Sequence, residues 1–207
     1  LRLNPPADAT WTLYTPVAGD AGIAKGGAGT LVVEQAFRKH ASLADPVTLA
    51  YEGRTTVTGG TLKVTNGADA HFAYGLGGGA TLDLDGAEIS GADLAVVGDG
   101  TLVNATLTRP TLRPAYADGT FATVTFGSGT SLSGRALVDF GRTAADPLPT
   151  DLEDVVIARW TGTKPDAGRW RSANLGDDEY KMTFVANDDG TITGSCERKG
   201  GLMLIFR

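Results

Sequence analysis

The stretch that decides the fold is Tyr51-Glu-Gly-Arg-Thr-Thr-Val-Thr-Gly-Gly-Thr-Leu-Lys-Val64, in which a glycine corner separates two short β-prone runs. Its Gly-Thr-Leu phrase recurs along the chain. Thr61, Thr81 and Thr101 lie 20 residues apart and each precedes a leucine; an earlier copy begins at Thr30, and a weaker echo occupies residues 129–132. A fixed period of short strands is typical of one supersecondary unit that is copied and stacked. The sequence therefore predicts a β-solenoid.

Alternation within each run predicts which side chains face the core. Leu62 and Val64 alternate with polar neighbours, as do Leu82 and Leu84, so the apolar residues share one face of each strand. In a solenoid these leucines would stack about 4.8 Å apart, one strand spacing, into columns. Burying one leucine contributes about 2 kcal/mol. Ordering each backbone residue costs about 1–2 kcal/mol, so stability must come from several stacked coils rather than from one.

The same patterning predicts the organisation of the chain. We expect an all-β protein with solenoid coils over residues 1–150 and a C-terminal antiparallel β-meander over residues 151–207 that caps the stack. Residues 34–46 are expected to form an inserted helix or loop, which explains why the first repeat interval is 31 residues and not 20. The boundary is placed at Asp146-Pro-Leu-Pro149, and Asn187-Asp-Asp-Gly190 predicts a hairpin within the cap. A cap would protect the last coil, whose edge would otherwise invite aggregation.

Composition narrows the classes of partner. The chain has 207 residues, 29 glycines and a formal net charge of −6. Such an acidic balance argues against nucleic acid and anionic membrane surfaces, which both require a basic footprint. No window is long and apolar enough for a transmembrane helix, and the single cysteine rules out an internal disulfide framework. The chain begins within its pattern, so we expect the remainder of a longer polypeptide upstream.

The repeat resembles the autotransporter-associated β-strand repeats of bacterial surface proteins. Lys25-Gly-Gly-Ala-Gly-Thr-Leu31 matches the first half of that motif, and the second half is matched by Tyr51, Gly53, Thr55, Val57, Gly60, Thr61 and Leu62. The chain departs from the motif in lacking the usual Asn before Tyr51 and in the insertion between the halves. The C-terminal residues also resemble the end of such passengers, through Gly168-Arg-Trp170, Tyr180 and the Asp-Gly hairpin.

This resemblance implies a right-handed parallel β-helix that is secreted or displayed on the outer surface of a diderm bacterium. The 20-residue periodicity, together with the absence of a convergent catalytic set, predicts a non-enzymatic stalk or adhesin, with host or environmental glycans or surface proteins as candidate partners. The membrane β-barrel that usually follows such passengers is not in this sequence.

An alternative is a polysaccharide-active β-helix similar to a pectate lyase. Asp83 and Asp85 lie at strand spacing on one outward face, where such an enzyme would pair carboxylates with a Lys or Arg from a neighbouring coil. We favour a solvated face for these acids, and we interpret Asp93 and Asp99 as turn residues.

The sequence gives little support for a metal site, a cofactor site or a catalytic nucleophile. His40 and His71 have no neighbouring metal-ligand partners, and the glycines near residue 75 match neither a phosphate loop nor a dinucleotide fingerprint. Cys196 lies near Arg198 and Lys199, which could lower its pKa, although a half-buried structural cysteine is the preferred interpretation. We therefore predict no catalytic residues, no cofactor and no metal.

One segment remains as a candidate binding patch. Arg159, Trp160, Trp170 and Arg171 could contact carbohydrate, because tryptophan faces stack on sugar rings and arginine binds carboxylates. A carbohydrate-binding module built on these residues is thus a third hypothesis. The competing interpretation, which we favour, is that both tryptophan rings pack the cap against the last coil.

Overall fold

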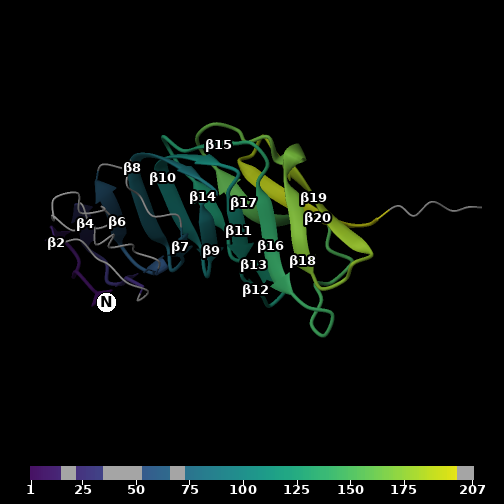
Figure 1. Ribbon diagram of the computed structural model, residues 1–207, viewed down its shortest axis with the longest axis horizontal. Helices are drawn as coiled ribbons and strands as arrows, with labels where there is room; N and C mark the ends of the chain where they lie inside the picture. Colours follow the sequence, from purple (N-terminus) through teal and green to yellow (C-terminus); the bar gives the residue numbers. More distant parts are fainter. Residues whose placement is uncertain (15–21, 35–52, 66–72, 200–207) are drawn as a thin grey trace, which may run out of the picture.

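A computed structural model of the chain describes residues 1–14, 22–34, 53–65 and 73–199. Within these residues the fold is all-β, and the only helical element is the three-residue 3-10 turn η2 (Ala167–Arg169). The strands follow one another along the long axis of the molecule, from β2 at one end to β19 and β20 at the other (Figure 1). Most of them belong to two large sheets, neither of which closes into a barrel.

Sheet A is entirely parallel and contains eight strands. Its order is β1 (Arg2–Leu3), β3 (Ala24–Lys25), β5 (Thr55–Val57), β7 (Ala73–Leu76), β9 (Asp93–Val96), β11 (Thr111–Pro114), β16 (Leu137–Arg142) and β18 (Arg171–Leu175).

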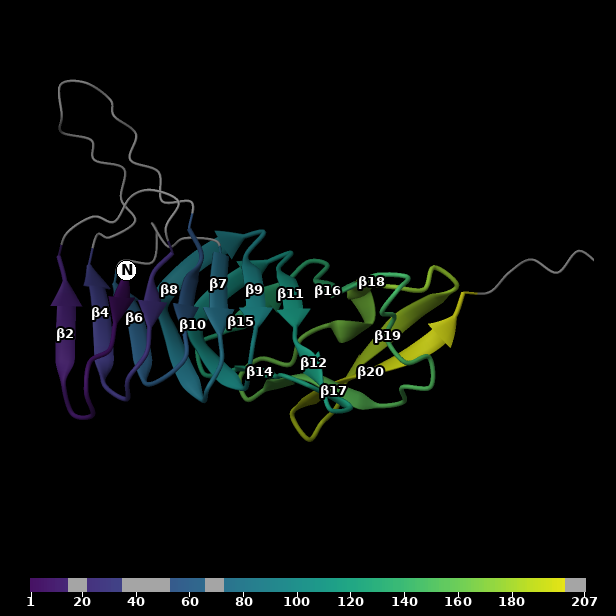
Figure 2. The same ribbon diagram turned by 90° about the horizontal axis from the view of Figure 1, so that it is seen from below.

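Sheet B is mixed. Its parallel part runs β2 (Thr10–Leu13), β4 (Thr30–Glu34), β6 (Thr61–Thr65), β8 (Ala80–Ser90), β10 (Gly100–Thr108), β14 (Val124–Phe126) and β17 (Val155–Trp160). Beyond β17 it continues with two antiparallel strands, β20 (Thr191–Arg198) and β19 (Tyr180–Ala186), while β15 (Ser131–Ser133) pairs with the second half of β10. Up to β11 the chain alternates between the two sheets, and Figure 2 shows β2, β4 and β6 of sheet B side by side.

The register of sheet B places one residue of each parallel strand in a single column. Paired residues along this column are Trp11, Leu31, Leu62, Leu82, Leu102, Phe126 and Trp160. The four leucines are at most 1% exposed and belong to one core shared by both sheets. The prediction that Leu62, Leu82 and Leu102 share an interior column is therefore confirmed. The predicted alternation is also confirmed, since Leu82 and Leu84 are buried while Asp83 and Asp85 are not.

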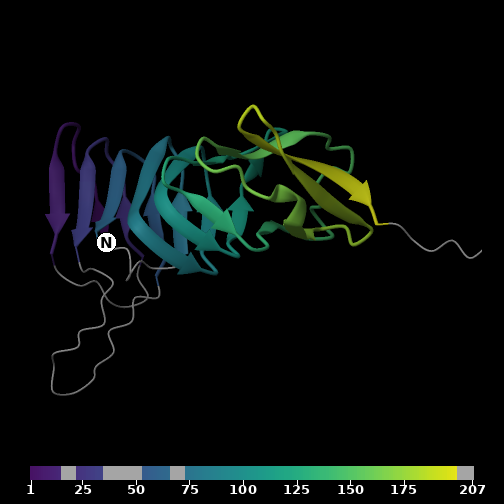
Figure 3. The same ribbon diagram turned by 90° about the horizontal axis from the view of Figure 1, so that it is seen from above.

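The two ends of the stack differ. At the N-terminal end, β2 pairs only with β4 among the described strands, and Trp11 is 44% exposed although it belongs to the core column. At the other end, β19 lies against sheet A. Its Met182 N–H donates to Ser172 Oγ at 2.9 Å, and the rings of Trp170 and Phe184 lie 5.9 Å apart. Figure 3 shows the antiparallel strands β19 and β20 at this end of sheet B.

Two segments depart from the simple repeat. The echo at residues 129–132 is not a fifth copy of the repeat, because Leu132 pairs with Leu107 and the next residue of the leucine column is Phe126. Residues 121–126 do not form one strand. They are divided between β14 and a small hairpin, β12 (Tyr116–Ala117) with β13 (Thr120–Phe121), because the chain turns at residues 118–119, both with positive φ.

The predicted boundary at residues 146–149 lies between strands, and both sheets continue across it, since β14 pairs with β17 and β16 with β18. The predicted hairpin at residues 187–190 is confirmed, with Asn187 N–H donating to the carbonyl of Thr191 at 2.8 Å. The inserted helix or loop expected at residues 34–46 falls almost wholly outside the described residues, as do residues 200–207 at the end of the expected meander, and both stay predictions.

Candidate functional site

The outward face of sheet B carries a column of threonines. Thr10, Thr30, Thr61, Thr81, Thr101 and Thr125 occupy equivalent positions on neighbouring strands, and Arg159 ends the column. These are the threonines of the Gly-Thr-Leu phrase and its relatives. β-Branched residues suit this pleated, half-buried surface, so the column has a structural explanation in strand propensity and cross-strand packing.

The two carboxylates of the enzyme alternative lie beside this column. Asp85 forms an ion pair with Lys63 of the neighbouring strand at 3.1 Å, and both side chains are more than one third exposed. Asp83 accepts hydrogen bonds from the Asn104 side chain at 2.9 Å and from the Asp85 N–H at 3.0 Å. The hydrogen bond with Asp85 and the charges of both carboxylates raise the pKa of Lys63. Sequence reasoning thus placed two acids and a lysine correctly on one face, where the lysine is held in its charged form.

A polar ladder, which sequence reasoning missed, crosses sheet A. Asp93 bonds to the guanidinium of Arg54 at 2.8 Å on one side and to that of Arg113 at 3.0 Å on the other. Arg113 also pairs with Asp139, which accepts from the Asn174 side chain at 2.7 Å. Asp139 is 6% exposed, so this carboxylate is satisfied almost entirely by protein groups.

The signal for this ladder was available in the sequence. Arg113 follows Asp93 by 20 residues, the repeat period, which places an acid and a base on neighbouring strands. The interpretation of Asp93 as a turn residue is wrong, because Asp93 is the first residue of β9.

Lys25 is the most unusual charged residue of the core. It is 0% exposed and occupies a column with Val57, Leu76 and Val96. Its ammonium donates to three backbone carbonyls, those of Gly27 at 3.0 Å, Gly29 at 2.6 Å and Gly59 at 2.5 Å. Burial lowers the pKa of Lys25, because the charged form has lost its water.

The predicted carbohydrate patch is divided between the sheets. Arg159 and Trp160 lie on β17 in sheet B, whereas Arg171 begins β18 in sheet A. Trp170 is 4% exposed, so its ring faces pack inside the protein. Arg171 is exposed and donates to the carbonyl of Trp170 at 2.8 Å. Carbohydrate contact at these residues stays a prediction, and Arg159 is the member that borders a cavity.

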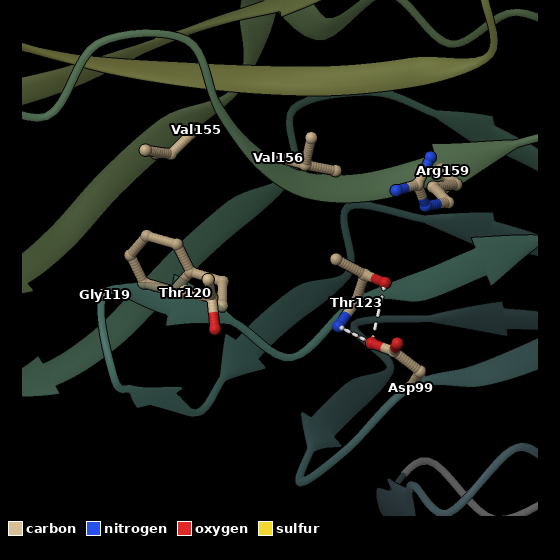
Figure 4. Close-up of a pocket in the computed structure, with 8 residues that line it drawn as sticks. Asp99, Gly119, Thr120, Thr123, Val155, Val156 and Arg159 are labelled. Carbon is tan, nitrogen blue, oxygen red and sulfur yellow. Dashed lines mark hydrogen bonds between the residues drawn. The ribbon is translucent and has the colours of Figure 1, made fainter.

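That cavity, of about 420 Å³, lies between the β12–β13 hairpin and β17. Its polar walls are Asp99, Thr120, Thr123 and Arg159, and its apolar walls include Phe121 and Val155 (Figure 4). One oxygen of Asp99 accepts both the N–H and the hydroxyl of Thr123, each at 2.9 Å. The interpretation of Asp99 as a turn residue agrees with its place between β9 and β10, but missed the cavity because the hairpin that forms it was not foreseen.

The structure also tests the prediction for the single cysteine. Cys196 is partly exposed on β20, and burial, aided by the charge of Asp151, raises its pKa. The expectation that Arg198 and Lys199 could lower it is therefore wrong.

His40 and His71 lie outside the described residues. In the part of the chain that the structure describes, no three His, Cys, Asp or Glu side chains gather to hold a metal ion, and no helix is long and apolar enough to cross a membrane.

Comparison with models of protein families, with curated proteins and with solved structures finds no match for this chain. Its functional interpretation therefore rests on the geometry of its own residues.

Proposed function

We propose that this chain is a segment of a right-handed parallel β-solenoid that serves as a non-enzymatic, structural or adhesive scaffold. The observation that supports it best is the column from Trp11 to Trp160, in which equivalent residues of seven successive strands of sheet B lie in register. Strands that alternate between two parallel sheets are what a chain makes when it winds repeatedly around one core. Such a rod presents long repetitive faces rather than a single cleft.

The open end of the stack supports a place within a longer rod. Trp11 is 44% exposed in a column whose next member, Leu31, is 1% exposed, so a further coil laid on β2 would bury the ring. We extend the proposal to an upstream continuation of the rod, and to display outside the cell or on the outer surface of a diderm bacterium, with glycans or surface proteins as partners. Immunolabelling of intact cells that make the protein tests the location: labelling only after the cells are opened would refute it.

Duplicating one coil tests the solenoid directly. A second copy of residues 81–100 inserted after residue 100 supplies one more complete period. If the chain is a solenoid, the insert stacks as a new coil and lengthens the rod by one strand spacing, about 4.8 Å. Spin labels at Thr12→Cys and Val185→Cys in a Cys196→Ser background would report this as a sharp distance distribution shifted by that amount.

A 20-residue Gly-Ser insert at the same place is the matched control. It cannot supply core leucines and is expected to loop out, leaving the label distance unchanged and lowering the stability. An unchanged or broadened distance with the coil duplication would contradict the solenoid.

The polysaccharide-active alternative keeps one supporting observation, the meeting of Lys63, Asp83 and Asp85 on one face. Its weakness is the raised pKa of Lys63, since a general base works best with a pKa near the operating pH. Assaying the full chain and its Asp83→Ala variant against a panel of polysaccharides separates the two functions. If the full chain degrades a polysaccharide and the Asp83→Ala substitution abolishes this turnover, the protein is an enzyme and the scaffold proposal is refuted.

A further inference from the structure

The β12–β13 hairpin interrupts the alternation between the sheets and creates a wall that the repeat itself would not provide. Residues 118 and 119 both have positive φ, as a tight two-residue hairpin turn requires. The base of the hairpin is fixed. The rings of Tyr116 and Phe121 lie 4.7 Å apart, and the Arg142 guanidinium donates to the Tyr116 carbonyl at 3.1 Å. The hairpin wall of the cavity beside β17 is therefore held in place at its base.

The two charged groups of this cavity, the carboxylate of Asp99 and the guanidinium of Arg159, do not pair with each other. Asp99 and Arg159 form no ion pair, and none of the hydrogen bonds between described residues involves the Arg159 side chain or the second carboxylate oxygen of Asp99. The pKa of Asp189 is lowered, chiefly by hydrogen bonds from Thr191 and to a smaller extent by the positive charge of Arg159. The cavity thus offers a held acceptor on one wall and a guanidinium on another, as Figure 4 shows.

We propose that this cavity binds a hexuronic acid unit of an acidic saccharide. The carboxylate of the sugar lies against Arg159, because arginine binds carboxylates with strong, geometrically matched hydrogen bonds and because Asp99 repels a negative charge from the opposite wall. Ring hydroxyls donate to the free oxygen of Asp99 and to the hydroxyl oxygen of Thr120, whose own hydrogen is donated to the carbonyl of Ala117 at 3.1 Å. The apolar face of the sugar ring packs on Val155 and Val156 of β17.

The size of the site agrees with such a ligand. A volume of about 420 Å³ lies within the range of small-molecule pockets. A second hollow of about 360 Å³ shares Asp99, Thr120 and Phe121 with the first, so a neighbouring sugar has room to continue the chain. This proposal goes beyond the scaffold role and does not depend on it, since the hairpin pocket would bind its ligand whether or not the rod is an adhesin.

Binding of D-glucuronic acid and D-glucose to the full chain tests the proposal, measured by saturation-transfer NMR and calorimetry. The two sugars differ only at the carboxylate, so the acid is expected to bind about tenfold more tightly or better through its charge-assisted bonds to Arg159. In the Arg159→Gln variant this preference should disappear, whereas Arg135→Gln, which removes an exposed arginine that does not line the cavity, should retain it. Asp99→Asn should weaken both sugars and keep the preference for the acid.

Equal affinity for the two sugars would overturn the proposal, as would an Arg159→Gln variant that still prefers the acid. Absence of saturable binding by the acid would overturn it too. Circular dichroism melting of each variant checks that the fold is retained, which is expected because the Arg159 side chain is exposed. None of these failures would alter the coil-duplication result, so the pocket and the scaffold stand or fall separately.

Discussion

Replacing Lys25 by methionine tests whether its three carbonyl contacts stabilise the fold. Methionine has a similar length and keeps the apolar packing, but it removes every donor to the carbonyls of Gly27, Gly29 and Gly59. Gly29 keeps a backbone hydrogen bond from the Thr61 N–H, whereas no other hydrogen bond between described residues reaches the carbonyls of Gly27 and Gly59.

The magnitude follows from two opposing effects. A hydrogen bond to a charged group contributes about 1.5–3 kcal/mol, and water replaces the lost donor more readily at the exposed Gly27 than at the half-buried Gly59, so the two lost bonds cost about 2–4 kcal/mol together. Removing a buried ammonium relieves part of this, because burial already disfavours the charged form and lowers its pKa. We expect a net loss of about 2 kcal/mol, which for a chain of this size lowers the melting temperature by about 4–8 °C.

Thermal and urea unfolding, followed by circular dichroism, measure this effect. Lys63→Met is the matched control, since Lys63 lies on the exposed face of the neighbouring sheet and its ion pair is solvated; its effect on stability is expected to be much smaller than that of Lys25→Met. A Lys25→Met variant as stable as the wild type would refute the reasoning. In that case the lysine would merely be tolerated in the core, with no stabilising role.

Three further substitutions or conditions probe other parts of the structure. Leu82→Ala removes a fully buried side chain from the middle of its column and should cost about 2–5 kcal/mol in urea unfolding, whereas a loss below about 1 kcal/mol would mean that the column is not tightly packed. Asp139→Asn weakens the buried end of the polar ladder and should cost about 1–3 kcal/mol, against less than about 0.5 kcal/mol for Asp146→Asn, whose ion pair is exposed; equal effects would contradict the ladder's role. The pKa of Cys196 is raised by burial, so alkylation of the folded chain should accelerate only above the pH at which the unfolded thiol ionises. The linked stability is full below the unfolded pKa and falls as pH rises through the folded one, and identical pH profiles for alkylation of the folded and urea-unfolded chain would show that burial does not act on this thiol.

The parts of the fold that sequence predicts are those that repeat with one period. The Gly-Thr-Leu spacing gives the register of Leu62, Leu82 and Leu102, because a fixed period aligns equivalent residues on adjacent strands. The period stops being informative where the chain inserts the β12–β13 hairpin, which moves Phe126 into the column 24 residues after Leu102. The hairpin turns at Asp118 and Gly119, although apolar and polar residues also alternate over residues 121–126, as they do in a continuous strand.

The polar features were harder to predict, because their partners belong to different strands. A fully buried lysine contradicts the rule that lysine is almost always exposed, and only the position of glycine carbonyls on neighbouring turns explains Lys25. The hairpin pocket likewise combines Asp99, Thr120 and Arg159 from three segments separated by up to 60 residues. The sequence drew attention to Arg159 because Trp160 follows it. In the structure, Arg159 lines the same pocket as the carboxylate of Asp99.

Methyl NOE spectroscopy of the leucine-labelled chain tests the central claim most directly. If the strands wind in register, Leu62 methyls must show cross-peaks to Leu82, and Leu82 to Leu102, since neighbouring strands lie about 4.8 Å apart. Cross-peaks from Leu62 to Leu102 should be absent or much weaker, because a whole strand separates the two. A spectrum in which Leu82 contacts neither of the other two would contradict the shared column and, with it, the scaffold built on it.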